Sequence, residues 1–156
     1  MNVLVGVILG IAVGGFATLT GFDRDRSFYP TVLIVIASYY GLFAVMGAPP
    51  FGPLIAEIAV GLIFLAVATL GFGLSPWLAA LGIAGHAGFD FLLHDRLIAN
   101  PGMPPWWPGF CGTIDLVIAA WLAAVLWRRR EARGSSQPAS SPRRPFSISA
   151  TDASTP

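Results

Sequence analysis

Five long apolar segments alternate with short polar connections along this chain. They run over residues 3–22, 30–48, 53–72, 76–94 and 108–127. Each segment is close to the roughly 20 apolar residues that a helix needs to cross the hydrocarbon core of a bilayer. Proline stands at or near the start of four segments, which suits the first helical turn because the N–H that proline lacks would have no partner there. The pattern predicts an all-α integral membrane bundle of five transmembrane helices.

The connections between these segments indicate how the helices pack. Three of them are short, so neighbouring helices are expected to lie antiparallel and side by side. The fourth, over residues 95–107, is longer, and its Trp106 and Trp107 are typical of an aromatic belt at the membrane surface. The first segment has no basic residues before it and is longer than the apolar part of a signal peptide, so we expect a permanent span. Its glycines recur every four residues, which predicts close packing inside the bundle.

Composition supports a membrane protein and excludes other classes. The chain has 156 residues, of which 55% are hydrophobic and only 11% are charged, whereas soluble domains have about 25% charged residues. The net charge of +1 gives no indication of nucleic-acid binding. The single cysteine, Cys111, excludes an internal disulfide and a CxxC metal motif. The main partner predicted is therefore the lipid bilayer, and oligomers remain an open alternative.

The residues after the last apolar segment have a different character. Residues 128–156 are polar and rich in serine and proline, so we expect a disordered tail beside a helical domain of residues 1–127. The arginines nearest the membrane are Arg128, Arg129, Arg130 and Arg133. The positive-inside rule predicts that they are cytoplasmic, and they could bind anionic lipid headgroups at about 1 kcal/mol each. Five spans then put the N-terminus outside, as expected for a protein of the bacterial inner (plasma) membrane.

Five ionisable side chains interrupt the apolar segments. They are Glu57, His86, Asp90, His94 and Asp115. With the tail inside, a rise of about 1.5 Å per helical residue puts all five in the outer half of the membrane. Ionisable residues inside membranes are rare and usually functional. The sequence therefore predicts one outward-facing site to which three different helices contribute.

The chemistry of that site depends on how its carboxylates are neutralised, because bare charges in a low dielectric are prohibitive. A divalent metal ion is one candidate, with His86, Asp90, Glu57 and Asp115 as ligands. Asp90 and Asp115 are then candidate catalytic ligands or bases, and His86 a candidate ligand or proton shuttle. His86 and His94 stand about 12 Å apart on one straight helix, too far to share an ion. We expect His94 in the headgroup region and assign no role to Cys111.

Three stretches of the sequence carry a resemblance to other proteins. They are "DRDRSFYPTVLIVIASYYGLFAVMG", "HAGFDFLLHD" and "PPWWPGFCGTIDLVIAAWLA". Together they resemble an uncharacterised family of small bacterial multi-pass integral membrane proteins, and the likeness covers the five spans but not the tail. The resemblance implies a multi-pass inner-membrane protein. It implies no activity, substrate or catalytic residue.

Three functions therefore remain open from the sequence. The first is a metal- or proton-binding site that performs hydrolytic or acid–base chemistry. The second is a small proton-coupled transporter in which Glu57 and Asp115 exchange protons, although the chain shows neither the internal repeat nor the even span count of many transporters. The third is an assembly subunit in which the polar residues only hold helices together. Whether the protein is an enzyme is not decided at this point.

Overall fold

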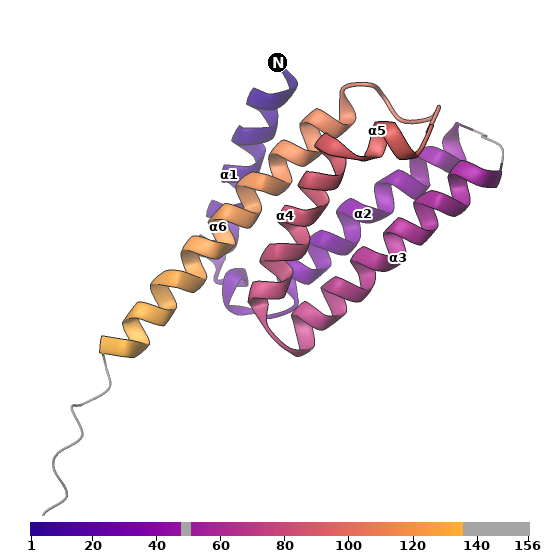
Figure 1. The fold of residues 1–156 in the computed structure, drawn as a ribbon. Coiled ribbons are helices and arrows are strands. Elements are labelled where there is room, and N and C mark those ends of the chain that lie inside the picture. The colour runs from indigo at the N-terminus through magenta and orange to yellow at the C-terminus, as the bar shows by residue number, and fades with distance from the viewer. Residues whose placement is uncertain (48–50, 136–156) are drawn as a thin grey trace, which may run out of the picture.

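The computed structural model describes residues 1–47 and 51–135, and helices make up most of this part of the chain. The helices are α1 (Asn2–Thr20), η1 (Phe22–Arg24), α2 (Phe28–Met46), α3 (Phe51–Gly73), α4 (Pro76–Leu92), α5 (His94–Leu97) and α6 (Trp107–Ser135). η1 is a single turn of 3₁₀ helix, and α5 is a single α-helical turn. Figure 1 shows the long helices side by side in one bundle.

Four helices in the described ranges are long and apolar enough to cross a membrane: α1, α2, α3 and α6. The predicted all-helical fold is confirmed for the described residues, and these four apolar helices are compatible with the predicted membrane protein. The fourth predicted span corresponds to α4, which has 17 residues and is about 25 Å long at 1.5 Å per residue. It ends before residue 94, because Leu93 leaves the helical conformation (φ −120°, ψ −36°) and His94 begins α5.

The long helices alternate in direction, as the short connections predicted. Figure 1 shows α4 in the middle of the bundle, with α6 on one side and α2 and α3 on the other. One end of the bundle, here called the arginine end, carries η1, the turn between α3 and α4, and the C-terminal part of α6. The opposite end, the α5 end, carries α5 and the first turn of α6. The arginines of η1 and α6 therefore lie at the same end.

Small residues allow α1 to approach α6 closely. Gly6, Gly10 and Gly14 are buried on one face of α1. A Cβ atom at Gly10 would lie 2.7 Å from Cβ of Val117, and one at Gly14 would lie 2.6 Å from the ring of Trp121. Backbones can come this close only where side chains are missing, as in many membrane helix pairs. The predicted role of these glycines in packing within the bundle is confirmed.

The last helix extends past the predicted end of the transmembrane domain. The tail was expected to be disordered from residue 128, but α6 continues through Arg128 to Ser135. Residues 128–133 are arginine, glutamate and alanine, which are good helix formers and favour continuation of the helix. Nε1 of Trp127 donates a hydrogen bond to Glu131, and Arg129 forms an ion pair with Asp23 at 3.2 Å. The rest of the predicted tail, residues 136–156, lies outside the described residues.

Candidate metal centre

Two helices bring four chemically active side chains together in the interior. His86 and Asp90 stand four residues apart on α4, and Cys111 and Asp115 stand four residues apart on α6. Residues at this spacing lie on the same face of a helix, one above the other. Because α4 packs against α6, the two pairs face each other and form a group that we call the aspartate cluster.

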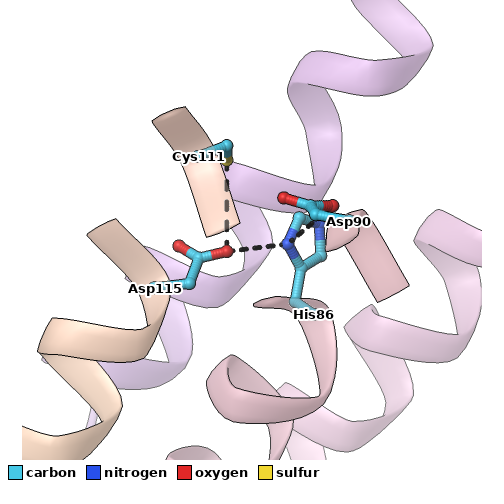
Figure 2. A group of neighbouring side chains, drawn as sticks. All are labelled: His86, Asp90, Cys111 and Asp115. Atoms are coloured by element: carbon cyan, nitrogen blue, oxygen red, sulfur yellow. Dashed lines mark hydrogen bonds and ion pairs between the residues drawn. The ribbon is translucent and has the colours of Figure 1, made fainter. Parts of the chain in front are cut away.

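The distances within the aspartate cluster are short. Nδ1 of His86 lies 2.8 Å from Oδ2 of Asp115 and 3.6 Å from Oδ1 of Asp90. Sγ of Cys111 lies 4.0 Å from the same Oδ2 atom of Asp115. One ligand atom from each of the four residues can be chosen so that all lie within 4.8 Å of one another. Figure 2 shows the four side chains converging on one point between the helices.

Burial makes the charges of this cluster costly. The exposed fractions are 1% for His86, 3% for Asp90, 4% for Cys111 and 0% for Asp115. Within the described part of the chain, both oxygens of Asp90 and Oδ1 of Asp115 have no hydrogen-bond partner. A buried polar atom without a partner costs about 1–3 kcal/mol, and more if it is charged. The cluster therefore needs a proton or a cation to complete it.

Aromatic side chains enclose the cluster. The ring of Phe64 lies 4.7 Å from the ring of His86, and the ring of Tyr40 lies 5.5 Å from it. The Tyr40 hydroxyl is close to Asp90 but is among the buried polar atoms that lack a hydrogen bond in the described residues. Gly112 leaves room for the Phe91 ring, since a Cβ there would lie 2.9 Å from it. The surroundings thus hold the histidine ring in place and exclude water.

A second buried group, which we call the Glu57 network, lies beside the cluster on the other side of Tyr40. Oε1 of Glu57 lies 2.8 Å from Nε2 of His94 and accepts a 2.7 Å hydrogen bond from Nδ2 of Asn100. Nδ2 of Asn100 also donates to the carbonyl oxygen of Tyr40 at 3.1 Å. The Tyr40 ring lies 4.7 Å from the ring of His94. One aromatic ring therefore contacts the histidines of both groups.

The structure brings together three of the four residues that were predicted as ligands. His86, Asp90 and Asp115 meet in the aspartate cluster, whereas Glu57 belongs to the Glu57 network. α4 ends at Leu92, before it reaches His94. His94 does not continue the face of α4; it starts α5 and is fully buried, not in the headgroup region as expected. In this position its Nε2 atom lies 2.8 Å from Oε1 of Glu57.

Sequence reasoning missed Cys111 and Asn100. Cys111 was assigned no role, although its four-residue spacing from Asp115 on a predicted helix put both on one face. That spacing is the signal that could have found it. Asn100 lies in the long connection between α5 and α6, where no periodicity indicates which side chains turn inward. Its position depends on contacts with Glu57 and Tyr40, which only the folded chain shows.

The donor atoms of the aspartate cluster fit a transition-metal ion. An imidazole nitrogen, a thiolate and carboxylate oxygens are the ligands of Zn²⁺. Bonds of about 2.0–2.3 Å in a tetrahedron put neighbouring ligand atoms roughly 3.3–3.8 Å apart. The observed separations of 3.6 and 4.0 Å are close to this range, and the 2.8 Å contact between His86 and Asp115 would have to lengthen.

Comparisons with protein-family models, curated proteins and solved structures found no match for this chain. The interpretation of the site therefore rests on its own residues.

Proposed function

We propose that the protein crosses the bacterial inner membrane five times, with its N-terminus outside and its C-terminus in the cytoplasm. In this arrangement α4 is the fourth of the five spans: its 17 residues are at the short end of the range for membrane helices, and it lies between spanning helices. The arginines at the arginine end support the orientation, because Arg24, Arg26 and those of α6 gather there while the α5 end has Arg96. The aspartate cluster then lies toward the outer side.

We further propose that the aspartate cluster binds one divalent transition-metal ion, with Zn²⁺ as the best match. The observation that carries this proposal is the Asp90 carboxylate, which is buried with no hydrogen-bond partner for either oxygen among the described residues. A divalent ion balances the charges of Asp90 and Asp115 and uses the free lone pairs. His86 and Cys111 supply the softer ligand atoms that Zn²⁺ accepts.

The number of protein ligands decides what the ion can do. Four ligands close a zinc site and make it structural, whereas three ligands leave a position for a water molecule that the metal can activate. If Cys111 binds as a thiolate, the site stabilises the bundle. If Cys111 stays a thiol, His86, Asp90 and Asp115 form a three-ligand site, which is what the acid–base chemistry predicted from the sequence requires. Because a Cys111 thiolate would leave a net negative charge in this buried site, we favour the form in which Cys111 stays a thiol.

The test is the metal content of the purified full-length protein and three variants. We expect about one equivalent of zinc in the wild type and in Glu57→Gln, which changes a buried carboxylate outside the cluster. Asp90→Asn should lose affinity by more than the roughly 10–100-fold that loss of an outer partner costs. If the site is closed, Cys111→Ser should bind zinc more weakly than the wild type. If it is open, the zinc affinity should not change. Metal-free, folded wild type in zinc-containing buffer would refute the proposal.

The second candidate function is proton handling. It is favoured by the 2.8 Å contact between His86 and Asp115 and by the neighbouring pair of His94 and Glu57. Two histidine–carboxylate pairs on either side of one tyrosine provide sites between which protons could move. Proton flux into vesicles distinguishes the candidates. A carrier shows flux that Glu57→Gln and Asp115→Asn abolish, whereas a metal site shows none.

A further inference from the structure

Five arginines surround a cavity at the arginine end. The cavity has a volume of about 740 Å³, and its lining is Arg24, Arg26, Pro76, Trp77, Leu126, Arg129, Arg130 and Arg133. It lies between η1 with the connection that follows it, the start of α4 and the end of α6, so three segments far apart in the sequence contribute to it. A volume of this size is typical of ligand sites, which range from about 300 to 1,000 Å³.

One of the arginines is fixed in place by the fold. Nη2 of Arg129 lies 3.2 Å from Oδ2 of Asp23, and Nη1 donates a 3.0 Å hydrogen bond to the carbonyl oxygen of the same residue. The bidentate contact ties α6 to η1 and holds the two arginine-bearing segments at a defined separation. The fold therefore fixes the position of one lining arginine and the distance between the two segments that carry the others.

The nearby acidic side chains have other partners. Asp23 is engaged by Arg129, Asp25 accepts hydrogen bonds from the N–H and hydroxyl of Ser27, and Glu131 accepts one from Trp127. The hydrogen bonds of Ser27 hold the pKa of Asp25 below its usual value. Positive charge therefore predominates around the cavity. The N-terminus of α4, at Pro76, adds its partial positive charge to the same place.

The lining has two chemically different parts. Four of the five arginines are exposed, while Pro76, Trp77 and Leu126 are partly or fully buried and apolar. An arginine guanidinium group can donate two parallel hydrogen bonds to two oxygens of one phosphate. An apolar floor suits the glycerol and first methylenes of a lipid better than it suits a free ion. We infer that this cavity binds the phosphate group of an anionic phospholipid.

The test uses two double variants that remove equal charge from the full-length protein. Arg24→Gln with Arg130→Gln removes two lining arginines. Arg96→Gln with Arg128→Gln removes one from α5 and one from α6, neither of which lines the cavity. All four side chains are exposed, so both proteins should fold, and their melting temperatures check this. Each protein is titrated in detergent with phosphatidylglycerol, phosphatidylcholine and inorganic phosphate, and binding is read by native mass spectrometry.

We expect phosphatidylglycerol to bind the wild type and the control variant with similar affinity and the cavity variant roughly thirtyfold more weakly. Each of the two lost arginines contributes about 1 kcal/mol near a membrane, and 1.4 kcal/mol corresponds to a tenfold change in affinity. Phosphatidylcholine should bind weakly to all three. Equal losses in the two double variants would show diffuse attraction and overturn the inference. Inorganic phosphate that binds as well as phosphatidylglycerol would make this a site for soluble phosphate and would also overturn it.

Discussion

Nδ1 of His86 lies 2.8 Å from Oδ2 of Asp115 and joins α4 to α6 in the interior of the bundle. The same nitrogen is also the His86 atom nearest to Asp90, at 3.6 Å. A ring nitrogen either carries a hydrogen that it donates or offers its lone pair to a metal, but not both at once. A metal ion that binds Nδ1 therefore has to replace this hydrogen bond, and the thermal stability of the protein should change when it does.

Zinc should stabilise the wild type much more than Asp115→Asn. A ligand that binds only the folded state adds about 2.7 kcal/mol when its concentration is a hundred times its dissociation constant. Asparagine keeps the size of the side chain but offers a weaker ligand. The measurement is the melting temperature in detergent with a chelator and then with zinc. Glu57→Gln is the control and should respond like the wild type; equal zinc responses in all three proteins would contradict a role of the cluster in metal binding.

Asp90 and Asp115 should show coupled effects on stability. Side chains in one network have interaction energies of about 0.5–3 kcal/mol, whereas distant sites add within about 0.5 kcal/mol. The cycle consists of Asp90→Asn, Asp115→Asn and the double variant, measured with and without zinc. Without metal, each single variant relieves repulsion between two buried carboxylates, so the second change should gain less than the first. Asp115→Asn combined with Asp25→Asn is the distant control. Additive effects in the first cycle would mean that the two carboxylates do not interact.

The pair of His94 and Glu57 predicts a pH dependence. Burial lowers the pKa of His94, but its hydrogen bonds to Glu57 and Asp95 and the charge of Glu57 outweigh it and raise the pKa above the ordinary value of 6.5. The folded state therefore binds the proton more tightly than the unfolded state. The stabilisation is complete below the unfolded pKa of about 6.5 and is lost as the pH rises through the folded pKa.

Melting temperatures between about pH 5.5 and 8.5, where histidine titrates, measure this effect. The wild type should lose stability on the alkaline side of pH 6.5, and Glu57→Gln should lose less of it, because its neutral amide does not favour the histidinium ion. Glu131→Gln makes the same chemical change on an exposed helix position and should follow the wild type. Identical pH profiles for Glu57→Gln and the wild type would show that the pair does not control the titration.

Periodicity and segment length predicted most of the fold, because apolar segments of membrane length leave the backbone few alternatives to helices. Four predicted spans coincide with candidate spans to within a few residues, apart from the longer C-terminal end of α6. The break at Leu93 was not predicted, since "GFDFLLHD" contains neither a proline nor a glycine after Asp90. After the break, His94 is buried against Glu57, a contact that only the folded chain shows.

Part of the candidate site was also predictable, because the geometry of a regular helix fixes which residues share a face and a depth. His86 and Asp90 share a helix face, and helical depth put Asp115 at a similar level, so their meeting follows from regular geometry. Depth alone does not say which way a side chain points around the helix axis. Glu57 matched in depth but points to α5, and Cys111 was passed over although it faces Asp115. The rotation of each helix against its neighbours was the missing information.

The packing of α1 against α6 should be sensitive to one added methyl group. Gly14→Ala puts a Cβ atom 2.6 Å from the Trp121 ring, and overpacking of this kind costs about 1–3 kcal/mol. Gly15→Ala is the matched control, since nothing lies within 4 Å of its Cβ position, and alanine is better than glycine in a helix by about 0.8–1.0 kcal/mol. Unfolding in mixed detergents should show a lower free energy of unfolding for Gly14→Ala and a slightly higher one for Gly15→Ala. Equal effects would mean that α1 does not contact α6 along this face.

The arginine end should face the cytoplasm, which a reporter fused after Arg133 can test. The arginines of η1 and α6 lie at the same end, held by the ion pair of Asp23 and Arg129, and such clusters remain on the cytoplasmic side. A reporter that works only in the cytoplasm should be active there, and one that works only in the periplasm should be inactive. The same pair of reporters fused before Asn2 should give the opposite result, because an odd number of spans separates the ends. Activity on the same side at both positions would show that α4 does not cross the membrane.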